Sequence, residues 1–145
     1  MVRIVQIAIS FIWVGMLAGI SFLEAPLKFR APGITLGLGL GISRLVFQAL
    51  NMVEIAFAVI LAATFLIARR ERGLPFYLFL GVAVLLGLQT FWLLPALDVR
   101  AEMVIQGDTP PGSNEHIFYI VFEIVKLLTL LVIGVAVSKR SGNSQ

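Results

Sequence analysis

The stretch Leu74–Leu97, with the sequence LPFYLFLGVAVLLGLQTFWLLPAL, contains no charged residue. A helix rises about 1.5 Å per residue, so this stretch is long enough to cross a hydrocarbon core of roughly 30 Å, which needs about 20 residues. Ile4–Leu23 is a second uncharged run, and two further apolar runs lie at 42–68 and 115–138. A membrane-spanning barrel would instead show short alternating segments. The sequence therefore predicts an all-α fold, an integral membrane four-helix bundle.

The composition favours one membrane domain. Hydrophobic residues make up 59% of the 145 residues and charged residues 13%, whereas soluble domains average about 45–50% and about 25%. The chain leaves no room for a separate soluble domain. We predict a single transmembrane domain over residues 1–145, with helices at about 2–23, 42–68, 75–97 with an extension to about 106, and 115–138.

Several classes of function are excluded by what the chain lacks. It has no cysteine and a single histidine, His116. Thiol catalysis, thiolate metal sites and metal sites built on several histidines are therefore excluded. We expect no metal and no cofactor. The net charge of +3 arises from lysines and arginines that cluster at helix ends, so we expect contact with membrane lipids and not with nucleic acid.

The positions of lysine and arginine predict how the bundle crosses the membrane. With four spans, the two termini and the second loop share one side, which carries Arg3, Arg69, Arg70, Arg72, Lys139 and Arg140. Because such a basic side faces the cytoplasm, we predict cytoplasmic N- and C-termini in a multi-pass protein of the bacterial inner (plasma) membrane. We interpret the first apolar run as a retained helix, since Pro26 follows the one plausible cleavage point.

Glycine and proline modify these runs. Residues 31–41, APGITLGLGLG, carry glycine at alternate positions, and glycine weakens a helix. We expect this segment to be a flexible apolar cover or a shallow re-entrant loop that can cradle an anionic headgroup. Gly15 and Gly19 form a small-xxx-small pair that permits close packing within the bundle or, alternatively, in a homo-oligomer. Pro26 argues against continuation of the first helix, and Pro95 is expected to kink the third.

Ionisable residues inside the apolar runs are the main functional signal, because a charge near the bilayer centre costs about 2.5–3.5 kcal/mol on insertion scales. The second helix carries a polar stripe at spacings of three and four, formed by Arg44, Gln48, Asn51 and Glu54. The fourth helix carries a matching stripe of His116, Tyr119, Glu123 and Lys126. Counting helical rise from the basic helix ends brings five side chains to one depth: Asn51, Glu54, Gln89, Glu123 and Lys126.

This polar layer contains two carboxylates and one ammonium. Either one carboxylate is protonated, or the layer holds a cation or a basic ligand group. A satisfied polar core that fixes helix register explains the pattern equally well. The candidate ligand-binding residues are Arg44, Gln48, Asn51, Glu54, Gln89, Tyr119, Glu123 and Lys126. An outer mouth is expected at Asp98, Arg100 and His116. No triad or paired-acid arrangement indicates a catalytic residue.

Most of the chain resembles an uncharacterised group of small four-helix bacterial membrane proteins related to the domain-of-unknown-function family of transmembrane protein 205. The motifs that carry the resemblance are Ala25-Pro26-Leu27-Lys28-Phe29, Arg44-x-x-Phe47-x-x-x-Asn51, Leu94-Pro95-x-Leu97-Asp98-x-Arg100 and His116-x-x-Tyr119-x-x-x-Glu123-x-x-Lys126. The resemblance implies four membrane helices, and this family has no agreed activity to carry over.

Arg44 and Asn51-x-x-Glu54 also resemble the second-helix pattern of the MAPEG superfamily of glutathione- and eicosanoid-metabolising membrane enzymes. This resemblance implies a trimer in which these residues contact glutathione. Phe47 stands where that family has an arginine. Three hypotheses therefore stand: a polar layer that binds a small polar ligand, cation or proton; a structural or partner-binding membrane subunit; and a glutathione- or lipid-metabolising enzyme. An enzyme is the less favoured.

Overall fold

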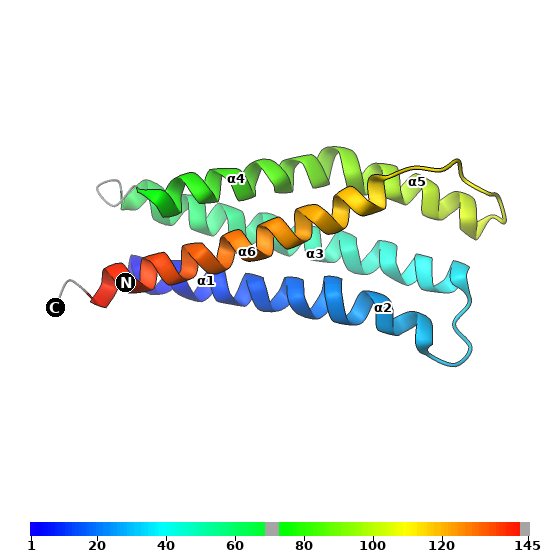
Figure 1. The fold of residues 1–145 in the computed structure, drawn as a ribbon, viewed down its shortest axis with the longest axis horizontal. Helices are drawn as coiled ribbons and strands as arrows, with labels where there is room; N and C mark the ends of the chain where they lie inside the picture. Colours follow the sequence, from blue (N-terminus) through cyan, green and yellow to red (C-terminus); the bar gives the residue numbers. More distant parts are fainter. Residues whose placement is uncertain (69–72, 143–145) are drawn as a thin grey trace.

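The computed structural model describes residues 1–68 and 73–142, with side chains described as far as Arg140 (Figure 1). Every regular element in these residues is helical. In chain order they are α1 (Val2–Leu17), η1 (Ala18–Glu24), α2 (Ala25–Leu27), η2 (Lys28–Arg30), α3 (Leu36–Ile67), α4 (Leu74–Leu88), η4 (Gln89–Leu93), α5 (Leu94–Ile105) and α6 (Glu115–Gly142). The segments η1 and η4 are π-helical, and η2 is a 3₁₀-helix.

Consecutive segments join into four apolar spans. Each is long and apolar enough to cross a membrane: Val2–Arg30, Leu36–Ile67, Leu74–Ile105 and Glu115–Arg140. The described part of the chain is thus an all-helical bundle compatible with a multi-pass membrane protein. Large apolar side chains are exposed on its outer surface, among them Leu45, Met52 and Phe91. Contact of such an apolar surface with lipid is favourable, whereas its contact with water is unfavourable.

Figure 1 shows the spans side by side, with both chain termini at one end of the bundle. We call the half that holds the termini the proximal half and the other the distal half. α1 packs against α6 and α3, α4 packs against α6, and α3 packs against α5. The fourth span, α6, begins short of the distal ends of α2, α3 and α5 (Figure 1). The distal half therefore has less helix to fill it.

The sequence analysis predicted that the first helix ends at about residue 23, and this prediction is wrong. The helix continues past Pro26 to Arg30 because the turns before the proline are widened into the π-helix η1, in which the Ala25 N–H donates to the Ile20 carbonyl. The third span repeats this arrangement, since the Leu94 N–H donates to the Gln89 carbonyl just before Pro95. Proline removes one hydrogen bond and crowds the preceding turn. A π-helical turn accommodates that defect without breaking the helix.

Only the first part of the glycine-rich segment is a loop: residues 31–35 are irregular, whereas residues 36–41 are helical. α3 begins at Leu36, where Thr35 caps the helix by accepting a hydrogen bond from the Leu38 N–H at 3.2 Å. Packing outweighs the low helix propensity of glycine at this end. A Cβ at Gly39 would overlap the Phe29 ring, and a Cβ at Gly37 would lie 3.8 Å from the Ile105 backbone. The missing side chain at Gly39 therefore allows α3 to approach the first span closely, whereas a Cβ at Gly37 would make only an ordinary contact with the third.

Three smaller expectations have clear outcomes. The third helix ends where Gly107, with φ of +91°, reverses the chain, as expected. The prediction that Gly15 and Gly19 pack inside the bundle is wrong, because a Cβ at either would meet nothing within 4 Å. The basic second loop, with Arg69, Arg70 and Arg72, lies outside the described residues.

Candidate functional site

The distal half contains a pocket of about 1030 Å³ bounded by all four spans. Its walls are mainly apolar and aromatic, with Phe22 and Phe29 from the first span and Phe47 from α3. Its floor carries polar side chains from every span, namely Ser21, Asn51, Thr90 and Glu123. Apolar pockets of roughly 300–1,000 Å³ with a few convergent polar groups are typical ligand sites.

A hydrogen-bonded charged network lies at and beneath this floor. We define it as Trp13, Ser21, Glu54, Gln89, Glu123 and Lys126, which come from all four spans. The Lys126 ammonium pairs with the carboxylate of Glu54 and, at 2.8 Å, with that of Glu123. The three charged residues are each at most 1% exposed. A buried charge needs such partners, because water cannot solvate it there.

Neutral donors complete the network. The Trp13 indole N–H donates to Glu54 Oε1 at 2.9 Å. Gln89 Nε2 donates to Glu123 Oε1 at 2.8 Å, and Ser21 Oγ donates to Glu123 Oε2 at 2.7 Å. Of the predicted polar layer, the structure therefore brings together Glu54, Gln89, Glu123 and Lys126. The Gln89 Oε1 atom is buried and has no hydrogen-bond partner in the described residues.

Asn51 belongs to the floor but not to this network. It donates from Nδ2 to Thr90 Oγ1 at 2.9 Å, and Thr90 in turn donates to the Leu86 carbonyl. This bond links α3 to η4 near the pocket, and Asn51 is 8% exposed. The sequence analysis grouped Asn51 by depth with the residues of the charged network, whereas in the structure its partner is Thr90 of η4.

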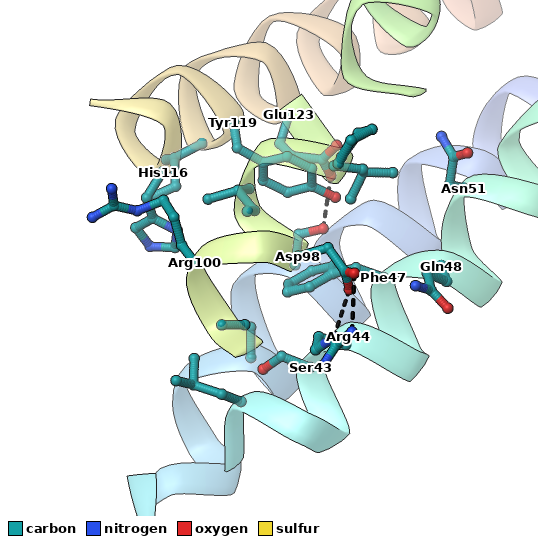
Figure 2. Close-up of a pocket in the computed structure, with 18 of the residues that line it drawn as sticks. Ser43, Arg44, Phe47, Gln48, Asn51, Asp98, Arg100, His116, Tyr119 and Glu123 are labelled. Atoms are coloured by element: carbon teal, nitrogen blue, oxygen red, sulfur yellow. Dashed lines mark hydrogen bonds and ion pairs between the residues drawn. The ribbon is translucent and has the colours of Figure 1, made fainter. Parts of the chain in front are cut away.

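Tyr119 lies on the α6 side of the pocket, above Glu123 (Figure 2). Its ring packs edge-on against Phe47 at a centroid distance of 5.3 Å. The side chain is 95% buried, being 5% exposed, yet its hydroxyl makes no hydrogen bond with any residue that the structure describes. The hydroxyl oxygen is not one of the fully buried polar atoms, so it is reachable from the pocket that Tyr119 lines. Tyr119 therefore offers a free donor and acceptor to whatever occupies the pocket.

Arg44 lies at the mouth of the pocket and not in the polar layer. Its guanidinium spans Asp98, with bonds of 2.5 and 2.9 Å, and also pairs with Glu102 (Figure 2). This mouth cluster of Arg44, Asp98 and Glu102 ties α3 to α5. Because Asp98 and Glu102 are four residues apart, one guanidinium can meet both. The three side chains are partly exposed, at 29%, 34% and 44%, so solvent screens the pairs.

The remaining predicted site residues lie around the rim. Gln48 lines the pocket but is exposed and makes no hydrogen bond with the described residues. Arg100 lines the rim and donates to the Pro111 carbonyl at 2.6 Å. His116 is exposed at the start of α6 (Figure 2). The pocket thus includes all three residues predicted for the outer mouth.

Sequence reasoning missed Trp13, Ser21 and Thr90. Trp13 packs in the bundle against Phe57, at a centroid distance of 5.9 Å. The hydropathy pattern does not indicate that its indole N–H donates a hydrogen bond to Glu54. Ser21 and Thr90 lie five residues before Pro26 and Pro95, inside the π-helical turns. A hydroxyl residue one turn or so before an intrahelical proline is the signal that could have found them, because π-turns cluster at functional sites.

No group of three or more metal-ligating side chains occurs among residues 1–68 and 73–142. Searches with this chain matched no protein-family model, no curated protein and no solved structure. The chemistry of the site must therefore be derived from its own residues. An apolar chamber with carboxylate, hydroxyl and amide groups at one end can hold an amphipathic molecule, with the polar part of that molecule at the floor.

Proposed function

We propose that this chain is a multi-pass membrane protein that binds a small amphipathic molecule in its distal pocket. The polar part of the ligand lies at the floor, beside Glu123 and the Tyr119 hydroxyl. The apolar part lies against the aromatic walls. The single observation that carries this proposal is the pocket of about 1030 Å³ with its polar floor in an otherwise apolar chamber. A well-packed bundle core would leave no such space.

The arrangement of the spans supports entry of the ligand at the distal end. α6 begins short of the other spans there (Figure 1). A ligand that enters beside the start of α6 meets the mouth cluster first and the charged network last.

The proposal includes a topology. Arg3, Lys139 and Arg140 lie at the proximal end of the bundle, which supports cytoplasmic termini by the distribution of basic residues. The pocket then opens toward the outer leaflet of a bacterial inner membrane, and the lipids there are its immediate surroundings. A reporter enzyme that is active only in the cytoplasm, fused to the C-terminus, tests the topology; an inactive fusion in intact cells contradicts it.

Native mass spectrometry of the protein, released gently from its membrane, tests ligand binding. We expect the wild-type chain to carry a discrete small-molecule mass. Leu97→Trp, which places an indole in the pocket, should remove that mass. Leu88→Trp is the matched control, because Leu88 lies on the same span, is 41% exposed and does not line the pocket.

The outcomes separate the proposal from its main alternative. An identical bound mass in both tryptophan variants would place the ligand outside the pocket. A wild-type chain without any bound mass, in every detergent and in lipid nanodiscs, would contradict the proposal. It would favour the hypothesis of a structural or partner-binding membrane subunit, in which the charged network only fixes helix register.

A further inference from the structure

The charged network has one more negative than positive group. Glu54 and Glu123 share the single ammonium of Lys126, and all three are at most 1% exposed. No other cationic side chain in the described part of the chain is ion-paired with either carboxylate. Arg44 is engaged by Asp98 and Glu102, and Lys28 by Glu24 at 3.1 Å. An uncompensated charge at this depth is strongly disfavoured, so the network requires one additional positive charge.

The two carboxylates differ in their access to the pocket. Glu54 does not line it, and both of its donors, Trp13 and Lys126, converge on Oε1. Glu123 lines the pocket floor. Its Oε2 atom accepts one hydrogen bond, from Ser21, within the described residues. A carboxylate oxygen has two lone pairs. The missing positive charge is therefore best supplied at Glu123, from the pocket side.

The pocket walls suit a large positive centre. Phe22, Phe29, Phe47 and Tyr119 all line the chamber, and aromatic faces attract cations through their quadrupole. Phe47 already has the Lys28 ammonium at 5.4 Å from its ring centroid. The Tyr119 hydroxyl, which lines the pocket and has no partner among the described residues, offers an additional acceptor next to Glu123. These features are independent of the charge count and point to the same class of ligand.

From this geometry we propose that the ligand of the distal pocket is a lipophilic organic cation, whose positive centre pairs with Glu123 and replaces a proton. This inference rests on the proposed function and specifies its ligand class. Without ligand, the network is neutralised by one proton held within the Glu54–Lys126–Glu123 group. When a permanent cation binds, the O–H bond breaks, the carboxylate keeps the electron pair and the proton leaves through the mouth to water. The net charge of the network together with its bound cation or proton is therefore the same before and after the exchange.

Other titratable and charged groups surround this exchange. Those packed around Glu123 or between it and the mouth are Lys126, Tyr119 and His116 on α6, Glu54 and Arg44 on α3, Asp98, Arg100 and Glu102 on α5, and Glu24 and Lys28 on the first span. Of the carboxylates among them, Asp98, Glu102 and Glu24 already have a cationic partner. The proton that competes with the cation is thus assigned to the Glu54–Lys126–Glu123 group.

The test uses tetraphenylphosphonium as the probe and tetraphenylborate, an anion of nearly the same size and shape, as its counterpart. Binding of both to the purified full-length protein is measured by calorimetry in weakly buffered detergent solution, with proton release followed by a pH indicator. We expect the cation to bind at least about tenfold more tightly than the anion, since the network attracts a positive charge and repels a negative one. Its binding should tighten as the pH rises and release up to one proton.

Glu123→Gln is the decisive variant. It leaves Glu54 and Lys126 as a balanced pair, so the fold should persist, and it should abolish the preference for the cation and the proton release. Asp108→Asn removes the same charge from a residue that does not line the pocket and should change neither. If Glu123→Gln unfolds, Glu54→Gln serves instead, because it removes the excess charge while Glu123 keeps Lys126; it should abolish the proton release.

Each remaining outcome overturns the inference. Equal binding of cation and anion, or cation binding that is indifferent to Glu123→Gln, contradicts the assignment of the ligand class. Failure of the cation to bind at all also contradicts it. The proposed function fails separately: it is lost only if the wild-type chain carries no pocket-dependent mass by native mass spectrometry, whatever the charge of the ligand.

Discussion

The proximal and distal halves of this bundle are made from the same four spans but are filled in opposite ways. The proximal half is closed by apolar side chains, including Leu61, Val82, Leu130 and Ile133, which are all fully buried. The distal half encloses a pocket with charged and hydroxyl groups at its floor. The distal parts of the spans also carry more charged residues, among them Arg44, Asp98 and Glu102, so composition and packing differ together between the two halves.

Two backbone features create the difference. The π-helical segments η1 and η4 precede Pro26 and Pro95 and present Ser21 and Thr90 at the floor. The late start of α6 then leaves the distal end without a complete fourth wall (Figure 1). Local defects in two helices and a shorter third therefore convert one half of an ordinary bundle into a chamber.

The largest expected effect concerns Lys126. Lys126→Met leaves Glu54 and Glu123 buried without a cation, and breaking a buried ion pair in this way costs about 3–5 kcal/mol. We expect the free energy of unfolding in detergent to fall by about that amount. Lys139→Met, at the exposed end of the same helix, should have little effect. Equal free energies of unfolding for the two variants would show that the charged network does not contribute to the stability of the bundle.

A triple variant sharpens this test. Glu54→Gln, Glu123→Gln and Lys126→Met together remove all three charges, and replacing a buried ion network by neutral groups is often close to neutral for stability. We expect stability to recover while ligand binding remains absent. Full recovery of both would support a network that serves helix register only, and would contradict a binding role.

The next effect contrasts a core leucine with a pocket leucine. Leu130→Ala removes a fully buried side chain in the proximal half and should cost about 2–5 kcal/mol, because it creates a cavity. Leu97→Ala enlarges a pocket that already exists and should cost about 1 kcal/mol or less. The measurement is chemical unfolding of both variants in the same detergent. Similar costs would mean that the distal half is packed like the proximal half.

A smaller effect is expected at the boundary between the halves. Trp13→Phe keeps an aromatic ring but loses the indole donor to Glu54, and a hydrogen bond to a charged group contributes about 1.5–3 kcal/mol. The melting temperature should fall accordingly. Trp92→Phe is the matched control, because Trp92 is 48% exposed. A larger loss in the control would contradict the assigned role of Trp13.

The smallest effect is expected at the mouth. Arg44→Gln breaks partly exposed ion pairs to Asp98 and Glu102, and solvent screening keeps their contribution to stability small. The difference from the wild type should shrink as salt is raised, because salt screens exposed charges. We expect the ligand to exchange faster in this variant, measured by competition with an added ligand. A loss as large as that of Lys126→Met would mean that the mouth, and not the floor, holds the distal half together.

The sequence predicted the depth of the charged network better than its partners. Helical rise is regular, so counting from basic helix ends was enough to align Glu54, Gln89, Glu123 and Lys126. The partner of Arg44 could not be found in this way, because the pairing of α3 with α5 depends on how the two spans are shifted along one another. That shift is set by the packing between helices, so it cannot be derived from the sequence of one helix alone.

Two local errors have the same physical origin. Glycine at alternate positions predicted a loop at residues 31–41, and Pro26 argued against continuation of the first helix, since both residues are poor helix formers. Each is tolerated because a neighbouring segment benefits: the Phe29 ring lies where a Cβ of Gly39 would be, and η1 widens before Pro26. Tertiary packing outweighed propensities of about 1–3 kcal/mol.

Cysteine accessibility tests most directly whether the distal half is an open, polar-floored chamber while the proximal half is closed. The chain has no native cysteine, so single-cysteine variants report one position each. We expect Thr90→Cys, at the pocket floor, to react with a small water-soluble thiol reagent in native membranes, and tetraphenylphosphonium to slow the reaction. Ile133→Cys, fully buried in the proximal core, should stay unreactive. Equal reactivity at both positions, or none at Thr90→Cys, would contradict the division of the bundle into a core and a binding chamber.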